Sequence, residues 1–382
     1  MSERWDVIVA GGGPAGSMAA RRLAAGGART LLLEKATHPR YKACGGGVPL
    51  RTVGLLGRSI DAVVEDSVHG IEISHLGERR FVKRSVEPLA YMVMRDSFDE
   101  MLLSWASEAG ADVRQGEAVR EVTSGSTCVS VSTNSGAYEA SLLLGADGAS
   151  GRVARATGLG VGMAKSAAWE LEVDAPSAAL DRWRGLANVD VGYRPWGYGW
   201  VFPKAGRLSI GLVTSPGRGH RIRAQANRYL ERLGLADAVI GEARGHPIRY
   251  RRGGERIAAG PVLLLGDAAG LADEFTAEGI AYAVESAGLA ATAALEALGG
   301  EGRAAERYTA AIDRAIQPEL DAARAISRMY YWCMSTWPWL ALGTSERVAY
   351  FWRALFRIMQ GRSTYRAELE RVPGLALTAR FL

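Results

Sequence analysis

The sequence predicts an α/β fold in which a parallel-sheet domain is interleaved with an α+β domain built on an antiparallel sheet, followed by C-terminal helices. Three observations predict it. A strand, a glycine-rich turn, a helix and a second strand follow one another within residues 5–34. Two later apolar strands, in residues 141–155 and 261–290, run into Ala-Asp-Gly or Gly-Asp. Between them lie short segments with the alternation that is typical of antiparallel strands.

Composition narrows the class of protein. The chain has 382 residues, 48% of them apolar, which is enough for a large core and for more than one domain. Its 46 basic and 41 acidic residues nearly balance, and no basic run carries the interleaved aromatic side chains of a nucleic-acid-binding module. We therefore expect no nucleic-acid partner.

The cysteines and the N-terminal segment indicate the compartment. Cys44, Cys128 and Cys333 lie far apart, without a CxxC pair or a histidine at ligand spacing, so we expect neither a disulfide framework nor a metal. The apolar run near the N-terminus is too short for a signal peptide or a membrane span. We expect a cytoplasmic protein, with a peripheral position at the inner face of the membrane left open.

Residues 5–34 predict a dinucleotide-binding unit of the Rossmann type. After the strand WDVIVA comes the turn GGGPAG, then a helix and a second strand that ends at Glu34. In this motif Gly11 allows the sharp turn, Gly13 lets the backbone approach a pyrophosphate, and Gly16 lets the helix pack close to the strand. The helix N-terminus attracts the phosphates, and Glu34 is placed to accept the hydroxyl groups of the adenosine ribose.

The two later segments indicate FAD rather than NAD. Asp147 lies in the Ala-Asp-Gly segment, where we favour a structural role beside the cofactor, and Asp267 ends the second buried strand. The segment around Asp267 is similar to a signature in which the aspartate contacts the ribityl chain of FAD. A helix that starts after Gly279-Ile280 would direct its N–H groups at the N1/O2 edge of the flavin, which becomes anionic on reduction. Together the three segments resemble the hydroxylase-like superfamily of flavoproteins.

Two further motifs narrow the resemblance. HPRYKACGGGVP spans residues 38–49, and PWGYGWVFP spans residues 195–203 and matches P-x-x-Y-x-W-x-F-P at every fixed position. Arg95 and Asp99 in RDSFDEML match a third element, whose arginine contacts FAD. With these motifs the chain resembles the geranylgeranyl reductase family of FAD-dependent oxidoreductases, over residues 1 to about 300 at least.

The resemblance implies an activity and a set of site residues. Family members saturate isolated C=C bonds of polyprenyl chains on membrane lipids, chlorophylls and menaquinones. The reductant left open is NADPH or a ferredoxin-like donor protein, since the sequence holds no second dinucleotide motif. The implied substrate-binding residues are Pro195, Tyr198, Trp200 and Phe202, and the catalytic candidates are Cys44, Tyr198 and Trp200. The implied cofactor contacts are Gly11, Gly13, Pro14, Ala15, Gly16, Glu34, Lys35, Arg40, Cys44, Gly45, Arg95, Val119, Asp147, Gly266, Asp267, Gly279 and Ile280.

The implied reaction adds a hydride and a proton to neighbouring carbons. Reduced FAD gives the hydride to one alkene carbon, and a proton must reach the other. Because an isolated alkene has no carbonyl group to polarise it, positive charge develops on carbon. Tyr198 and Trp200 are then either walls of an apolar cavity, which we favour, or aromatic faces that stabilise the cation. Cys44 either relays a proton, keeps the flavin dry, or is a small core residue beside a glycine turn.

The motifs divide the chain into a discontinuous FAD-binding domain, an interleaved substrate-binding domain and a C-terminal helical region. The expected boundaries are 1–75, 90–160 and 255–300 for the first, 76–89 and 161–254 for the second, and 301–382 for the third. Strands of the substrate domain are expected at 167–173, 187–193, 198–202 and 208–213. Residues 329–359 are crowded with aromatic side chains and interspersed arginines, which fits either core-packing helices or a surface that touches a membrane.

Three other functions share parts of this pattern. An FAD-dependent monooxygenase of a hydrophobic or aromatic substrate has the same FAD frame but does not require Cys44 within CGGG or the YxWxFP segment. A flavin-dependent halogenase carries W-x-W-x-I-P at the corresponding place, where this chain has Tyr198 and Phe202. A non-catalytic flavoprotein that binds a prenyl lipid is the third alternative, and a flavin that no donor reduces would favour it.

Overall fold

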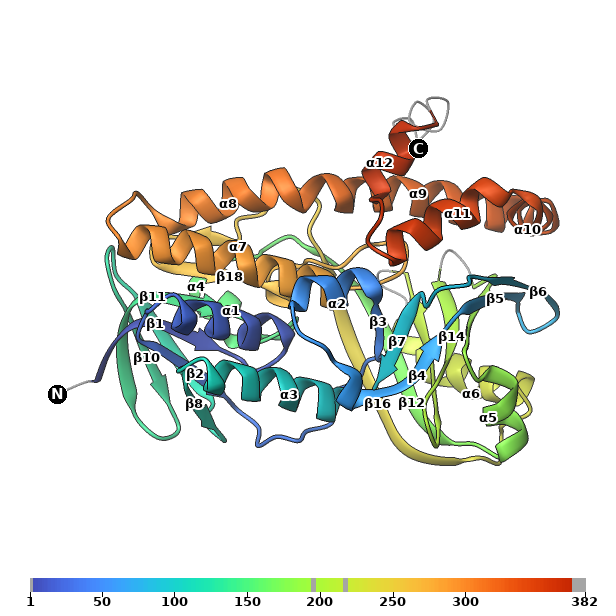
Figure 1. Ribbon diagram of the computed structural model, residues 1–382, viewed down its shortest axis with the longest axis horizontal. Helices are drawn as coiled ribbons and strands as arrows, with labels where there is room; N and C mark the ends of the chain where they lie inside the picture. Colours follow the sequence, from blue (N-terminus) through green and yellow to red (C-terminus); the bar gives the residue numbers. More distant parts are fainter. Residues whose placement is uncertain (1–2, 194–196, 216–218, 373–382) are drawn as a thin grey trace. The chain divides into compact units, whose positions relative to one another are not determined.

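A computed structural model describes residues 3–193, 197–215 and 219–372, and this part of the chain divides into two compact units (Figure 1). Unit 1 comprises Met1–Tyr41, Asp96–Ala164 and Arg249–Asp321, and unit 2 comprises Lys42–Arg95, Lys165–Ile248 and Ala322–Leu382. The expected α/β class is confirmed. The expected three-part domain division stays a prediction. The compact units differ from it at residues 42–75, whose strands pair within unit 2, and at residues 301–382, which both units share.

Unit 1 contains an eight-stranded sheet among the described residues. β1 (Glu3–Ala10) lies between β2 (Thr30–Glu34) and β11 (Ala137–Gly145) and is parallel to both. β2 is buried along its whole length, which explains its unbroken apolar run. The strand order is β17-β18-β11-β1-β2-β8, with β10 and then β9 continuing from β11. The remaining strands are β8 (Asp112–Gln115), β9 (Val119–Ser124), β10 (Val129–Thr133), β17 (Ala258–Ala259) and β18 (Val262–Leu264).

Two long helices of unit 1 lie side by side, α1 (Pro14–Ala25) and α7 (Ile280–Leu298) (Figure 1). The guanidinium group of Arg22 on α1 lies directly against α7, where a Cβ on Gly288 would overlap it. The unit also contains α3 (Arg95–Glu108), α4 (Arg152–Thr157), the short 3₁₀ helix η3 (Gly266–Ala269), α8 (Ala304–Ala315) and the start of α9 (Gln317–Thr336).

Unit 2 contains a seven-stranded sheet within the described part of the chain, in the order β16-β12-β15-β14-β13-β5-β6. The four strands expected from the sequence are confirmed, although β13 ends at Val191, two residues before the expected end. Their bounds are Ala164–Asp174 (β12), Leu186–Val191 (β13), Gly197–Pro203 (β14) and Leu208–Thr214 (β15). The other strands are β5 (Gly70–His75), β6 (Arg79–Arg84) and β16 (Val239–Tyr250). A smaller sheet is formed by β3 (Gly47–Pro49), β7 (Ala90–Val93) and β4 (Val64–Val68).

The two faces of the seven-stranded sheet have different neighbours. On one face, Leu171 and Val201 pack with Trp183 of α5 (Ser177–Trp183) and Tyr229 of α6 (Ile222–Arg232). On the other face, apolar side chains of β5, β6 and β13 pack with C-terminal helices. These helices are α9, α10 (Pro338–Arg347) and α11 (Ala349–Met359), and the unit also contains α2 (Leu50–Leu56) and α12 (Tyr365–Glu370). None of the helices in the described residues is long and apolar enough to cross a membrane.

Candidate FAD and substrate sites

The glycine-rich turn after β1 gives each of its three motif glycines a different setting. Gly11 has φ +106°, a backbone conformation that favours glycine. A Cβ on Gly16 would overlap the carbonyl oxygen of Gly11, so the start of α1 packs directly on the turn. Gly13 is open by contrast, because a Cβ there would have Arg40 Nη2 as its nearest neighbour, at 3.8 Å. The turn therefore leaves space above Gly13, at the N-terminus of α1.

Two carboxylates hold the Arg40 guanidinium group beside this turn. Nη2 of Arg40 lies 3.1 Å from Oδ2 of the fully buried Asp99, and Nε lies 3.8 Å from Oε1 of Glu34. Glu34 in turn accepts hydrogen bonds from the amides of Gly12 (2.6 Å) and Ala36 (2.9 Å). Nη1 of Arg40 is buried and has no hydrogen-bond partner among the described residues. A buried charged donor beside a helix N-terminus without a side-chain cap fits an anionic group such as a pyrophosphate.

The segment after β18 meets the same turn. Gly266 has φ +51°, and a Cβ on it would lie 3.1 Å from Ala15 Cβ and 3.2 Å from Ala283 Cβ. The start of η3 is therefore wedged between the N-terminal turns of α1 and α7. Asp267, the next residue, lies close to Gly279, since a Cβ on Gly279 would be 3.3 Å from Asp267 Oδ1. Unit 1 thus brings together site residues that the sequence places more than 250 positions apart.

Sequence reasoning missed Asp273, which shapes the loop before α7. Its buried carboxylate accepts hydrogen bonds from the amides of Phe275 (2.9 Å) and Thr276 (2.6 Å) and from Oγ1 of Thr276 (2.7 Å). The loop also holds Ala277 at φ +57°. Gly279 ends the loop and forms the N-cap of α7, and Oε1 of the preceding Glu278 accepts a 2.7 Å hydrogen bond from the Ala281 amide. An aspartate two and three residues before its backbone donors is an Asx-type turn, a local signal that the sequence does contain.

The Asp147 carboxylate forms hydrogen bonds within its own segment of the chain. Its Oδ2 accepts hydrogen bonds from the amides of Arg152 (2.5 Å) and Val153 (2.9 Å), so it closes the N-terminus of α4. Burial raises the pKa of Asp147 above its ordinary value, and the backbone hydrogen bonds partly oppose this. Oδ1 is buried and has no partner within the described chain. The carboxylate therefore has a structural role and one oxygen left for a further donor.

The other expected cofactor contacts have varied settings. Lys35 follows β2 and is exposed, Val119 opens β9 and is half-buried, and Arg95 is the buried first residue of α3. His38, which the sequence did not single out, is buried with both ring nitrogens unpartnered within the described residues. Burial, with Arg40 as a second cause, lowers the pKa of His38 below its ordinary value.

In unit 2, the YxWxF side chains form a stripe on one face of the sheet. Tyr198, Trp200 and Phe202 alternate along β14, with ring centroids 6.3 and 6.2 Å apart. Trp200 is buried, and the other two are half-buried. A Cβ on Gly211, its partner on β15, would overlap the Trp200 indole, so the ring packs directly against this glycine. Pro195, the fourth expected substrate contact, lies outside the described residues.

The CGGG loop of unit 2 contacts this stripe. A Cβ on Gly45 would lie 2.7 Å from the ring of Phe202 and 3.1 Å from Nε1 of Trp200. Gly46 has φ +74°, and a Cβ there would overlap the carbonyl oxygen of Val93. Cys44 is half-buried and does not pair with another cysteine. The two motifs that narrowed the resemblance are therefore neighbours in the fold.

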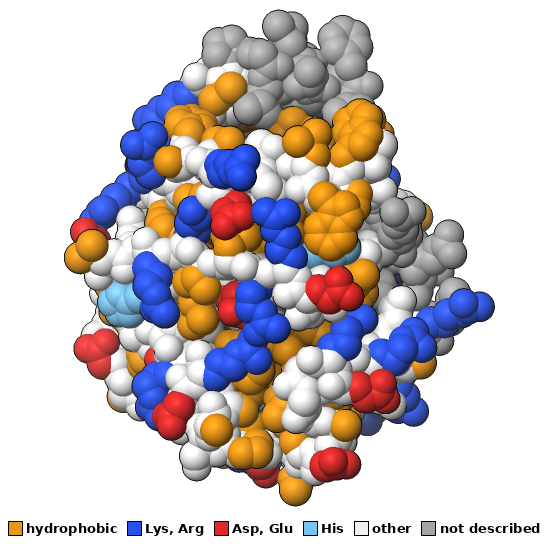
Figure 2. All heavy atoms as spheres, turned by 90° about the vertical axis from the view of Figure 1, so that its right-hand side faces the viewer, with side chains coloured by type: hydrophobic (Ala, Val, Ile, Leu, Met, Phe, Trp, Pro, Cys, Tyr) orange, Lys and Arg blue, Asp and Glu red, His pale blue; other side chains and the backbone are white. Residues whose placement is uncertain are grey.

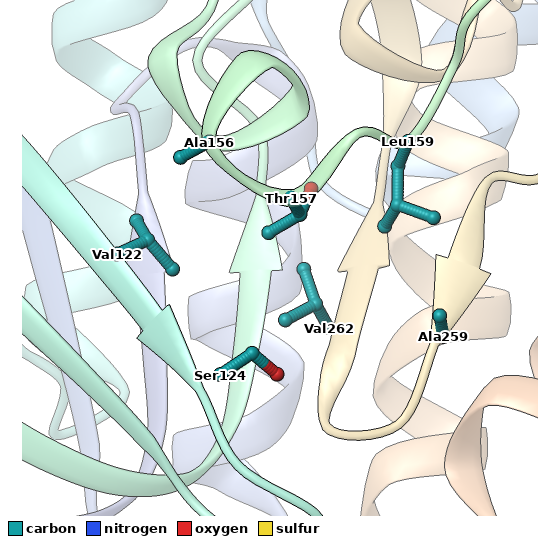
Figure 3. A pocket seen from close by; sticks show the side chains of 7 residues that line it. All are labelled: Val122, Ser124, Ala156, Thr157, Leu159, Ala259 and Val262. Carbon is teal, nitrogen blue, oxygen red and sulfur yellow. The ribbon is translucent and has the colours of Figure 1, made fainter.

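A separate cavity of about 270 Å³ lies in unit 1. Figure 3 shows its lining side chains, which come from β9, α4, β17, β18 and the segment after α4. They are Val122, Ser124, Ala156, Thr157, Leu159, Ala259 and Val262. None of these residues carries a charge or belongs to the expected site. Among the described residues, no group of three or more His, Cys, Asp and Glu could hold a metal ion.

Comparisons with known proteins agree with this geometry. Residues 4–191 match the FAD binding domain family. A chloroplastic geranylgeranyl diphosphate reductase of Oryza sativa is 32% identical over 86% of this chain and 75% of its own. A digeranylgeranylglycerophospholipid reductase of Thermoplasma volcanium is 30% identical over 78% and 79% of the two chains. A menaquinone reductase of Mycolicibacterium smegmatis is 30% identical over 76% of each.

Solved structures support the fold. A geranylgeranyl bacteriochlorophyll reductase-like protein of Thermoplasma acidophilum aligns with a TM-score of 0.77 and 22% identity, over 98% of this chain and all of its own. The flavin-dependent brominase Bmp2 aligns with a TM-score of 0.72 and 17% identity, over 99% and 100% of the two chains. The FAD binding domain and the sequence relatives define the chain as an FAD-dependent oxidoreductase. It belongs to the geranylgeranyl reductase family.

Proposed function

We propose that this protein saturates C=C bonds of a polyprenyl chain of the geranylgeranyl type, carried by a lipid, a quinone or a chlorophyll-like molecule. The observation that carries the proposal is the contact of the CGGG loop with the Tyr198–Trp200–Phe202 stripe in unit 2. This stripe offers an apolar, aromatic surface and no charged side chain of its own. Three relatives act, by their names, on different prenyl-bearing molecules. This supports the prenyl chain, rather than the head group, as the shared feature of their substrates.

The residues of unit 1 that would hold FAD follow from the geometry. The open backbone at Gly13, the α1 N-terminus and Arg40 would take the pyrophosphate, and Glu34 would accept ribose hydroxyl groups. Asp267 would contact the ribityl chain, and the N-terminus of α7, where Oε1 of Glu278 accepts from the Ala281 amide, would face the flavin. When bound and reduced, FAD supplies the hydride.

The side chains of unit 2 would bind the alkene and exclude water from it. Trp200 is fixed by packing against Gly45 and Gly211, so its role as a rigid wall needs no rearrangement. Tyr198 and Phe202 flank it and would order the prenyl chain along β14. Cys44 would adjoin the flavin, either relaying a proton or keeping its surroundings dry. The reductant would be NADPH or a ferredoxin-like protein.

The test is a single anaerobic experiment on the FAD-loaded protein. The flavin is reduced with dithionite, geranylgeranyl diphosphate or a geranylgeranyl lipid in detergent is added, and flavin absorbance and product mass are followed. We expect the oxidised flavin spectrum to return without oxygen, with two hydrogens added to the product per turnover. A Trp200→Ala variant, which opens the wall but leaves unit 1 intact, should bind FAD normally and turn over more slowly.

Other outcomes identify the alternatives. A flavin that stays reduced until oxygen enters, and then yields an oxygenated or halogenated product, would establish a monooxygenase or a halogenase. The halogenase neighbours share the fold, and their identity of 17–22% carries no further argument. A flavin that no donor reduces would identify a non-catalytic prenyl-lipid-binding flavoprotein.

We also propose a peripheral membrane contact through an aromatic corner of unit 2, defined as Trp332, Trp337, Trp339 and Leu340. Their exposed fractions are 46, 53, 54 and 68%, unlike the buried Trp352 nearby. β6 adjoins the corner, because Arg79 on β6 pairs with Glu346 on α10 at 3.1 Å, and its exposed arginines are basic neighbours. Figure 2 faces this end of unit 2 and shows hydrophobic and basic side chains interspersed. Such a surface suits the interface of an anionic bilayer.

A further inference from the structure

Acidic and basic side chains are buried next to the aromatic stripe of unit 2. Strand register places them on its face of the sheet: Glu170 on β12 pairs with Gly211 on β15, which pairs with Trp200. Glu172, two residues further along β12, is therefore on the same face. Both side chains are almost entirely buried. Neither was singled out by the sequence, where both lie in an ordinary strand pattern.

Glu170 joins the two motifs of the proposed substrate site. Its Oε2 accepts a 2.6 Å hydrogen bond from the backbone amide of Cys44, which anchors the CGGG loop. Its Oε1 accepts a 3.2 Å hydrogen bond from Oγ of Ser209, which in turn accepts from Nε1 of Trp200 at 3.4 Å. A continuous chain of hydrogen bonds therefore runs from the Cys44 backbone through a buried carboxylate to the Trp200 indole.

Glu172 lies beside a buried lysine. Its Oε1 accepts a 2.5 Å hydrogen bond from Nζ of Lys204, and the two side chains are only 2% and 1% exposed. Its Oε2 is buried and has no donor partner in the described chain. The nearby Glu170 carboxyl group interacts electrostatically with Glu172. Two carboxylates cannot hydrogen-bond to each other, but a protonated Glu172 can donate to Glu170. Burial raises the pKa of Glu172 to about 7, and the Glu170 contact adds to the rise.

The surrounding charges explain why one proton is retained. Glu170, from the same strand, and Lys204, from the turn between β14 and β15, are the main charged groups that act on Glu172. Just before the CGGG loop, Nζ of Lys42 contacts the ring of His246 on β16, the strand next to β12. Ser209 and Trp200, from the neighbouring strands, are neutral, and the CGGG loop contributes its backbone. Lys204 also lies at this loop, because a Cβ on Gly46 would be 3.4 Å from Nζ. One ammonium group balances one carboxylate, so the second carboxyl group is held neutral.

We propose that Glu170 and Glu172 share a single proton and act as positioning residues, which hold the Cys44 loop against Trp200 only while that proton is present. Loss of the proton leaves two buried carboxylates facing one lysine. Their repulsion loosens the hydrogen bond to the Cys44 amide and frees the loop. The link to turnover rests on the proposed function, whereas the state of the loop can be measured without any substrate.

The first measurement is the alkylation rate of Cys44 in the FAD-loaded full chain. Cys128→Ser and Cys333→Ser remove the other thiols, and a Cys44→Ser variant supplies the blank. The rate with iodoacetamide is measured from about pH 6 to about pH 9, across the titration of the pair. The matched comparison is Glu172→Gln, whose amide can donate to Glu170 and accept from Lys204 as the protonated acid does.

We expect the two proteins to react alike near pH 6. Above about pH 7 the parent should react faster than Glu172→Gln, by about threefold or more, because only the parent loses the proton and loosens the loop. The extra negative charge of a deprotonated Glu172 disfavours the thiolate in the parent and would by itself slow its alkylation, so a faster reaction of the parent reports the loosened loop. A ratio that stays constant over the whole range would overturn the proposal.

A second variant keeps the test decisive if Glu172→Gln does not fold. Lys204→Met removes the ammonium group that lowers the pKa of Glu172, so the rise in Cys44 reactivity should move to higher pH. A rise at unchanged or lower pH would contradict a shared proton held against Lys204.

Turnover separates this inference from the proposed function. If geranylgeranyl diphosphate is reduced, kcat should fall as pH rises through about 7 in the parent and fall less in Glu172→Gln, while KM changes little. If no prenyl substrate is reduced, the proposed function fails and the alkylation ratio still tests the carboxyl pair. If kcat depends on pH in the same way in both proteins and the alkylation ratio is constant, Glu170 and Glu172 have only a structural role.

Discussion

The indole of Trp200 lies against Gly211 on the neighbouring strand, where a Cβ would overlap both this ring and the backbone carbonyl oxygen of Trp169. The motif tryptophan is therefore positioned by a glycine outside the motif. We expect Gly211→Ala to push the ring away and to destabilise the protein by about 1–3 kcal/mol, as overpacked cores do. Denaturant unfolding measures the loss, and tryptophan fluorescence reports the displaced ring. Gly206→Ala, in an open turn of the same hairpin, is the control. Equal stability of the two variants would contradict the contact.

Alanine substitutions at Gly13 and Gly16 should have different effects, the first on FAD binding and the second on folding. A Cβ on Gly13 meets only Arg40 Nη2, at 3.8 Å, so Gly13→Ala should fold normally but block the approach of the pyrophosphate. We expect FAD affinity to fall about tenfold or more, as measured by flavin fluorescence, with an unchanged melting temperature of the FAD-free protein. Gly16→Ala should instead disrupt folding, because its Cβ overlaps the Gly11 carbonyl oxygen. Normal FAD binding by Gly13→Ala would show that the cofactor does not approach there.

We expect Asp273 to contribute to stability and to FAD binding, although it belongs to no motif. Asp273→Ala removes three hydrogen bonds to a buried carboxylate, and we expect a loss of about 3 kcal/mol in unfolding free energy. FAD binding should weaken as well, because the loop leads into the N-terminus of α7. Ala277→Gly in the same loop should raise stability by about 1 kcal/mol, since Ala277 has φ +57°. A stable Asp273→Ala variant with normal FAD affinity would contradict this role of the loop.

The raised pKa of Glu172 gives stability a pH dependence of known sign. The folded protein holds the proton up to about pH 7, whereas the unfolded chain releases it near 4.5. The stabilisation is thus fully present below about pH 4.5 and is lost as pH rises to about 7. At most about 3 kcal/mol is at stake. Unfolding free energies of the parent and Glu172→Gln are compared between pH 5 and 8. The parent should lose stability relative to Glu172→Gln as the pH rises. Parallel curves would exclude a raised pKa at this site.

Membrane contact is tested with vesicles. We expect the protein to sediment with anionic lipid vesicles and to release on addition of salt, because arginines contribute to binding. A double variant, Trp337→Ala with Trp339→Ala, should bind at least several-fold more weakly. Val161→Ala, which truncates an even more exposed apolar side chain in unit 1, should bind as the parent does. Equal vesicle binding by all three proteins would contradict a membrane contact through the aromatic corner.

Local patterns predicted much of the fold. The alternation at 198–202 and 208–213 predicted two strands, and the glycine spacing at 11–16 predicted a strand, a turn and a helix, all of which the structure contains. These predictions succeed because strand periodicity and glycine backbone freedom depend only on residues close in sequence. The C-terminal aromatic segment was ambiguous for the same reason. Its pattern is the same whether a ring is buried, like that of Trp352, or exposed, like that of Trp339.

The sequence by itself determined the FAD-binding class of this protein, the family, and the motif residues that nominate the site. Only the tertiary structure decided which residues support that site. Glu170 anchors Cys44 from 126 positions away, and Gly211 makes room for Trp200 through strand register. The same register buries Glu172 against Lys204, where loss of solvent changes its pKa. Burial and neighbours from distant segments set these properties, and neither is encoded in the local pattern of the chain.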